Sequence, residues 1–149
     1  MSNPVLREAA RDDVPAVLRL LADDFIGHSR GAQADEHAYG AFEEIARDPN
    51  KILYVLDDDG AVVGCAQLTL IPGLSRRGMR RAQIESVRVA SDRRGQGLGQ
   101  RMMREFITIA RAKGCGMVQL ATDKRRVDAH RFYEALGFED THKGFKLAL

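Results

Sequence analysis

Residues 84–100 read Ile84-Glu85-Ser86-Val87-Arg88-Val89-Ala90-Ser91-Asp92-Arg93-Arg94-Gly95-Gln96-Gly97-Leu98-Gly99-Gln100. Strand-forming residues lead into a turn with glycines at alternate positions, and an amphipathic helical pattern follows. Glycines let backbone N–H groups approach a ligand closely, and a helix N-terminus carries a partial positive charge. The pattern therefore predicts a phosphate-binding loop between a strand and a helix.

Three known phosphate-loop patterns resemble this turn in having closely spaced glycines, and they differ in the residues required around them. A Walker A loop requires Lys after its last glycine, where this chain has Gln100. The dinucleotide pattern G-x-G-x-x-G, counted from Gly95, requires glycine at the same Gln100 position. The third pattern, Arg/Gln-x-x-Gly-x-Gly/Ala, is met by Arg94, Gly97 and Gly99.

The rest of the chain predicts alternating strands and helices. Helical spacing of apolar residues begins at Val14, after Asp12 and Asp13 as candidate N-caps, and recurs over 35–47, 98–110 and 128–136. Strand patterns cover residues 5–9, 51–56, 61–71, 83–89, 118–122 and 143–149, with a hairpin turn at 57–60. Because no linker, repeat or low-complexity stretch interrupts them, we expect one α/β domain.

Composition excludes several classes of protein. The 149 residues are 44% hydrophobic with a net charge of +2, which is typical of a globular domain and argues against a nucleic-acid binder. The sequence contains no apolar run long enough for a membrane helix and no export signal, so we expect a cytoplasmic protein. Cys65 and Cys115 form no CxxC pair and the histidines lack metal-ligand spacing, so we expect reduced thiols and no metal.

Glu85 is the candidate general base. Alternation places Gln83, Glu85, Val87 and Val89 on one face of the strand and Ile84, Ser86 and Arg88 on the other. A carboxylate in a central strand is costly to bury unless it is paired, solvated or functional. Two interpretations remain open: Glu85 accepts a proton, or it forms a salt bridge near Arg88 or with the basic loop 76–81.

A second block, Ala129-His130-Arg131-Phe132-Tyr133-Glu134-Ala135-Leu136-Gly137-Phe138, completes a family pattern. Together with residues 84–100, it makes the chain resemble the GNAT N-acetyltransferase superfamily over nearly its whole length. The resemblance implies a single N-acetyltransferase domain, residues 1–149. It also implies an α/β (α+β) fold with a central mixed, mostly antiparallel, twisted sheet flanked by helices on both faces. Acetyl-CoA would be the cosubstrate, without a metal.

The same resemblance implies roles for individual residues. Tyr133 would protonate the departing thiolate, which suits a phenol that is neutral at pH 7, although packing of Tyr133 against the sheet is the alternative. Glu85 would take the amine proton through water, and the Val87 N–H would polarise the thioester carbonyl. The coenzyme-binding residues would be Val87, Arg88, Val89, Arg94, Gly95, Gln96, Gly97, Leu98, Gly99 and Gln100. Val87 and Val89 would pair their backbones with the pantetheine arm.

One position departs from the family pattern. Many relatives carry a coenzyme-contacting Asn three residues before the Ala of the second block, and Arg126 stands there in this chain. The Asn contact is therefore not carried over. Arg126 either approaches the coenzyme phosphates or belongs to a solvated charge run.

The acceptor side is suggested by a narrower resemblance. Residues 120–133 and 141–147 are similar to aminoalkylphosphonate acetyltransferases, and the loop containing Arg76, Arg77, Arg80 and Arg81 suits an anionic group. Residues 28–30 lie where relatives shape the acceptor pocket. We therefore expect direct acetyl transfer to a primary amine of a small, anionic molecule such as an aminoalkylphosphonate.

Two alternatives to this function stay open: a peptide or protein amine as acceptor, and a non-catalytic acyl-CoA-binding regulatory module. The expected partner is a small-molecule amine, with neither nucleic acid nor membrane. Homodimers are common in the superfamily, so a second copy of the chain is a further candidate partner.

Overall fold

The computed structural model describes residues 2–23 and 33–149, which fall into two units, one ending at Gln119 and one comprising Leu120–Leu149. The candidate acceptor residues 28–30 lie outside the described residues. Within residues 2–23 and 33–149, no helix is long and apolar enough to cross a membrane.

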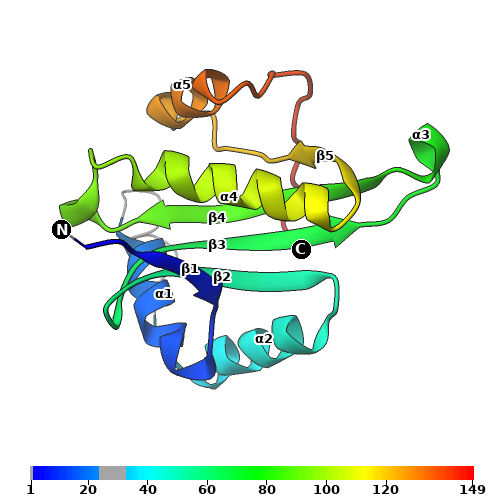
Figure 1. Ribbon diagram of the computed structural model, residues 1–149. Coiled ribbons are helices and arrows are strands. Elements are labelled where there is room, and N and C mark those ends of the chain that lie inside the picture. Colours follow the sequence, from blue (N-terminus) through cyan, green and yellow to red (C-terminus); the bar gives the residue numbers. More distant parts are fainter. Residues whose placement is uncertain (1, 24–32) are drawn as a thin grey trace. The chain divides into compact units, whose positions relative to one another are not determined.

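The first unit is built on a five-stranded sheet whose strands follow chain order (Figure 1). The strands are β1 (Val5–Glu8), β2 (Lys51–Asp58), β3 (Ala61–Ile71), β4 (Arg80–Val89) and β5 (Cys115–Gln119). The first three pairings are antiparallel and β4 pairs with β5 in parallel. The predicted mixed, mostly antiparallel sheet is therefore confirmed.

Helices cover both faces of this sheet (Figure 1). The helices that pack on the sheet are α1 (Val14–Ala22), α2 (Glu36–Arg47) and α4 (Leu98–Ala112), and the short η1 (Arg11–Asp13), α3 (Ser75–Gly78) and η3 (Ser91–Arg93) lie in the connections between elements. On one face, Leu20 of α1 shares a buried cluster with Val55 and Cys65. On the other, the ring of Phe106 in α4 lies 5.4 Å from that of Tyr54. Successive β2 residues thus serve opposite faces, as the pleat of a strand requires.

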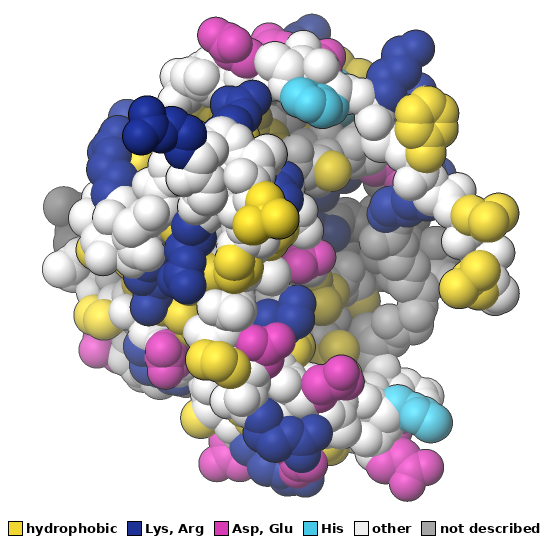
Figure 2. Space-filling view, turned by 90° about the vertical axis from the view of Figure 1, so that its right-hand side faces the viewer, with side chains coloured by type: hydrophobic (Ala, Val, Ile, Leu, Met, Phe, Trp, Pro, Cys, Tyr) yellow, Lys and Arg dark blue, Asp and Glu magenta, His cyan; other side chains and the backbone are white. Residues whose placement is uncertain are grey.

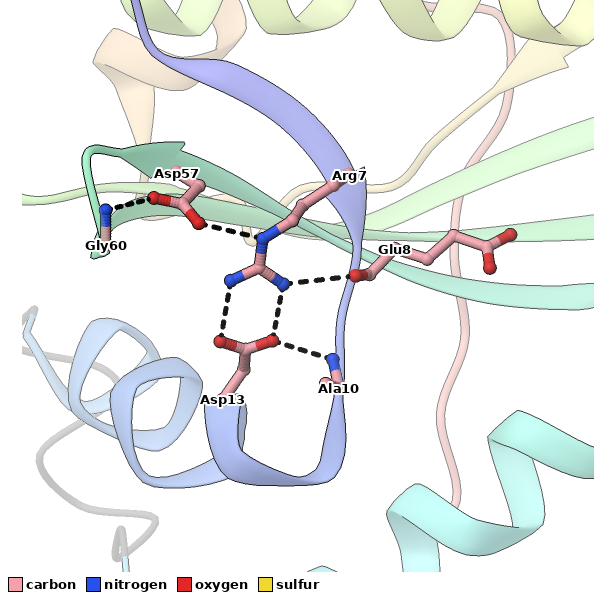
Figure 3. A network of polar contacts seen from close by, with 6 residues as sticks. All are labelled: Arg7, Glu8, Ala10, Asp13, Asp57 and Gly60. Carbon is pink, nitrogen blue, oxygen red and sulfur yellow. Dashed lines mark hydrogen bonds and ion pairs between the residues drawn. The ribbon is translucent and has the colours of Figure 1, made fainter.

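A polar network fixes the start of α1 to the sheet (Figure 3). The Arg7 guanidinium donates to both oxygens of Asp13, at 2.7 and 3.0 Å, and to Asp57 at 2.8 Å. Asp13 also accepts from the Ala10 N–H at 2.7 Å. The predicted capping role of Asp13 is wrong in its detail: it makes no side-chain cap hydrogen bond to α1, because Arg7 and Ala10 engage its carboxylate.

The second unit contains α5 (Val127–Ala135), close to the predicted helix. The predicted last strand, 143–149, is wrong: no strand forms there among the described residues. Its alternating side chains Phe145, Leu147 and Leu149 are all exposed, and a period-two pattern forms a strand only with a ladder partner.

The last strand of the first unit also differs from its predicted position. The sequence predicted 118–122, whereas β5 spans Cys115–Gln119. Gly114, in the left-handed region at φ +79°, turns the chain out of α4, so that Cys115 already pairs with Arg80. The start of the predicted segment 118–122 is therefore the end of β5, and its remaining residues follow the strand.

Candidate active site

A β-bulge interrupts β4 at the predicted catalytic strand. Glu85 pairs with Gln67 and Arg88 pairs with Cys65, so Ser86 and Val87 together face one β3 residue. Ser86 adopts φ +58°, and its carbonyl accepts a hydrogen bond from the Cys65 thiol at 3.5 Å. Such a bulge adds a residue to one strand and re-aims the backbone beyond it.

Because of the bulge, two β4 side chains lie on faces opposite to those predicted. Arg88 shares the face of Glu85, because their β3 partners are two residues apart. Val89 pairs with Gly64, on which a Cβ would lie 3.5 Å from the Met102 sulfur, so Val89 points toward α4. Strict alternation predicted instead that Val89 shares the face of Glu85 and that Arg88 lies on the opposite face. The extra residue shifts the period-two pattern by one position.

β4 also has an open edge. Its pairing with β5 ends at Gln83 and Gln119, while β4 continues to Val89. In the described part of the chain, no strand follows on this side, so the backbone from Glu85 to Val89 lacks a ladder partner there. Unpaired N–H and C=O groups at a strand edge can accept an added extended segment. The predicted backbone contacts of Val87 and Val89 require such an edge.

The Glu85 side chain lies on solvent-exposed surface of β4. No ion pair or hydrogen bond joins its carboxylate to residues 2–23 or 33–149. Its burial cost is therefore avoided by solvation, and the salt bridge that was the alternative interpretation is not found among the described residues. The carboxylate is open to a ligand or water.

The glycine loop directly precedes α4, as predicted, and it follows η3, which the sequence did not predict. Gly95 and Gly97 adopt φ +80° and +75°, and Gly97 is the N-cap of the 15-residue α4. A Cβ at either glycine would meet no atom within 4 Å, so left-handed backbone rather than crowding requires glycine. Exposed Arg94 donates to the Asp23 carbonyl at 3.3 Å. Open space, a helix N-terminus and a guanidinium fit a pyrophosphate.

An ion pair that the sequence did not suggest anchors this loop. The Arg93 guanidinium donates to Asp58 at 2.6 Å, and the Asp58 side chain is only 7% exposed. The Ala90 N–H donates to the Val63 carbonyl at 2.9 Å in the same region. The β2–β3 turn therefore holds the chain immediately before the glycines. Asp58 belongs to the acidic turn Asp57-Asp58-Asp59-Gly60. The sequence of such a turn is typical of solvent-exposed carboxylates, so it does not predict the partner of Asp58.

Tyr133 belongs to the second unit. It lies half-buried on α5, with its ring 5.1 Å from that of Phe132 and 5.8 Å from that of Phe138. On the same helix, the His130 ring is 3.1 Å from the Asp123 carbonyl, which is a structural contact. The Arg126 carbonyl accepts from the Ala129 N–H at 3.1 Å, where α5 begins.

The predicted basic loop is divided by the structure. Arg76 and Arg77 are exposed in the short α3, with left-handed φ values of +53° and +62°. Arg81 lies on β4, where it donates to the Gln119 side chain at 3.1 Å. On the face shown in Figure 2, basic and acidic side chains are interspersed, in keeping with the net charge of +2.

Comparison with known proteins identifies relatives over most of the chain. The model of the acetyltransferase (GNAT) family matches residues 14–138. A crystal structure described as a transcriptional regulator from Bacillus halodurans C-125 superposes with a TM-score of 0.95 at 39% identity, covering 99% of this chain and 100% of that one.

Two of the relatives with a named acetyltransferase activity act on amines that carry a phosphate or phosphonate. A glucosamine 6-phosphate N-acetyltransferase of Trypanosoma brucei brucei is 36% identical over 90 residues, which are 60% of this chain and 59% of the relative. The match thus spans little more than half of that relative. An aminoalkylphosphonate N-acetyltransferase of Salmonella typhimurium is 28% identical over 144 residues, 97% of this chain and 90% of the relative.

Proposed function

Because the chain belongs to the acetyltransferase (GNAT) family, we propose that residues 1–149 act as one domain that transfers acetyl from acetyl-CoA directly to a small-molecule primary amine. One observation carries the proposal: the bulged, open-edged half of β4 is followed, after the short η3, by the glycine loop at the start of α4. Exposed Glu85 lies at the start of that half. A thioester and an amine need to be held in register, and such an edge can hold one of them.

Acetyl-CoA supplies the activated acetyl group. Residues 94–100 would hold its pyrophosphate through the N–H groups at the start of α4 and the Arg94 guanidinium. The backbones of Val87 and Val89, with Arg88 between them, would hold the pantetheine arm along the open edge of β4. The family's Asn contact is absent from this set, because Arg126 occupies its position.

Three groups would then move or stabilise charge. Glu85 would accept the amine proton through water, which leaves the nitrogen lone pair free to attack. The Val87 N–H would stabilise negative charge on the thioester oxygen. Tyr133 would donate its phenolic proton to the departing sulfur. No residue forms a covalent bond in this scheme, so binding and orientation would supply much of the acceleration.

The acceptor in this proposal carries an anionic phospho group. Two relatives support it, because glucosamine 6-phosphate and aminoalkylphosphonates both combine an amine with such a group. An arginine on β4, Arg81, offers the matching charge.

A screen of amines tests the proposal. The full chain is incubated with acetyl-CoA and single amines, including amino sugars, aminoalkylphosphonates, polyamines and lysine peptides, and free thiol is followed with time. We expect thiol release that depends on a small amine. Binding of acetyl-CoA without amine-dependent release would instead favour a non-catalytic acyl-CoA-binding module, and release with peptides alone would favour a protein acceptor.

A further inference from the structure

One rung of the sheet is polar across four strands. Register places Lys51, Thr69, Gln83 and Gln119 side by side on the face that bears Glu85; we call these four residues the polar rung. On the opposite face, the neighbouring Leu68 and Ile84 are 0% and 1% exposed. The four side chains are half-buried, and half-buried polar groups need hydrogen-bond partners from the protein, from water or from a ligand.

The hydrogen bonds of this rung run in one direction. Arg81 donates to the side-chain oxygen Oε1 of Gln119 at 3.1 Å, and the side-chain nitrogen Nε2 of Gln119 donates to Oε1 of Gln83 at 3.0 Å. Both amide oxygens are therefore used as acceptors. The Gln83 amide nitrogen keeps two N–H donors at the end of the chain of bonds, and it makes no hydrogen bond to the described residues.

Thr69, beside Gln83 on β3, adds an unsatisfied group. Its hydroxyl oxygen is buried and has no hydrogen-bond partner within the described part of the chain. Buried hydroxyls are normally hydrogen-bonded, so the Thr69 hydroxyl has the capacity to bond to a water or to a ligand group. The hydroxyl and the Gln83 amide face the same side of the sheet, so one ligand group could bond to both.

Charge along β4 gives this ligand a direction. Glu85 lies two residues beyond Gln83 on the same face, a spacing of about 7 Å along a strand. Arg81 lies two residues on the other side of Gln83, and Lys51 ends the rung on β2. Arg88 lies on this face beyond Glu85, so the Glu85 carboxylate stands between Arg88 on one side and the cationic or neutral donors of the rung and Arg81 on the other. A molecule with an amine and an anionic group complements that order.

We propose that the polar rung, together with Arg81, binds the anionic phospho group of the acceptor while its amine lies at Glu85. This rests on the proposed function and deepens it in two ways. It assigns the anion to Arg81 rather than to Arg76 and Arg77, which lie in the exposed α3. It also defines the acceptor as a small amine whose phospho group stands about 7 Å from the nitrogen.

Paired acceptors test this assignment. Thiol release by the full chain is measured with 4-aminobutylphosphonate and with the neutral 4-amino-1-butanol. Arg81→Gln should raise KM for the phosphonate at least tenfold, because hydrogen bonds to charged groups are strong. KM for the neutral amine and for acetyl-CoA should stay within twofold. Thr69→Val should raise the phosphonate KM less, and Arg104→Gln, which removes an exposed cation from α4, should change none of these values.

Each other outcome has a separate meaning. Arg81→Lys keeps the positive charge and should retain most of the preference for the phosphonate, even if Arg81→Gln folds poorly. A wild-type chain that acetylates neutral amines as well as phosphonates would overturn the inference and leave the proposed function intact. Equal effects of Arg81→Gln on both acceptors would also overturn the inference. Absence of thiol release with every amine would overturn the proposed function.

Discussion

Tyr133 differs from phenylalanine by the one hydroxyl that the proposed reaction uses. In Tyr133→Phe, the ring can keep its contacts with Phe132 and Phe138, so the chain should remain folded. We expect kcat to fall by about 10²-fold, the scale of general acid catalysis, while KM for acetyl-CoA stays within twofold. Tyr39→Phe on α2 is the matched control. An unchanged kcat, with chemistry shown to be rate-limiting, would remove Tyr133 from the mechanism.

The Asp58–Arg93 ion pair holds the chain immediately before the glycine loop against β2. Removing the buried charge in Asp58→Asn weakens the bond that holds Arg93 beside the loop. We expect acetyl-CoA affinity, measured by calorimetry, to fall about threefold to tenfold, or ~0.6–1.4 kcal/mol, with a smaller change in kcat. Asp59→Asn, in the same turn and exposed, should bind normally. Equal affinity in the two variants would show that Asp58 does not position the loop.

Arg7 makes the stability of the protein depend on pH through Asp13. Its hydrogen bonds lower the pKa of the Asp13 carboxyl in the folded chain. The folded state thus binds this proton less readily than the unfolded state, so the stabilisation is present near neutral pH and is lost as pH falls below about 5.

Asp13→Asn tests that linkage. We expect it to lower the free energy of unfolding by about 1–3 kcal/mol at pH 7, because Arg7 loses a charged partner. The difference from wild type should shrink toward pH 3. Urea unfolding at pH 7, 5 and 3 measures it, with the exposed Asp12→Asn as control. A difference that stays constant with pH would mean that Asp13 acts through packing rather than charge.

At the scale of elements, local pattern predicted strand and helix well and predicted pairing poorly. The glycine loop was predictable because Gly95 and Gly97 need only local backbone freedom. The bulge at Ser86 was not, because it depends on how β4 registers with β3. For the same reason the alternation over 143–149 predicts a strand that the structure does not contain among its described residues. Alternation shows that a segment suits a sheet, but not that a partner strand is there.

Gly64 shows how closely β3 packs in the first unit. A Cβ there would lie 3.2 Å from the Arg88 carbonyl and 3.3 Å from the Leu56 Cβ, tighter than ordinary contact. Gly64→Ala should therefore lower the free energy of unfolding by about 1–3 kcal/mol, as overpacked cores do. The same change at Gly40, inside α2 with nothing within 4 Å, should raise it by about 0.5–1 kcal/mol. Thermal unfolding of both variants gives the comparison, and a stabilised Gly64→Ala would mean that the strands separate readily.

At the scale of the whole molecule, the proposed chemistry is divided between the two units. Glu85, Val87 and the glycine loop belong to the first unit, and Tyr133 belongs to the second. Sequence alone predicted both parts through one family pattern. The proposed roles therefore predict that addition of acetyl-CoA changes amide exchange in each unit.

Hydrogen exchange of the full chain, with and without acetyl-CoA, tests whether residues of each unit respond to acetyl-CoA. A ligand at 100 times its Kd stabilises the form that binds it by about 2.7 kcal/mol, which slows exchange wherever opening requires its release. We expect protection at the glycine loop and β4 and, independently, over α5. Tyr133→Phe should show the same protection at the glycine loop, β4 and α5, since it removes only a hydroxyl. Protection confined to the first unit would mean that acetyl-CoA binds without engaging α5, and the general acid would then have to come from the first unit or from water.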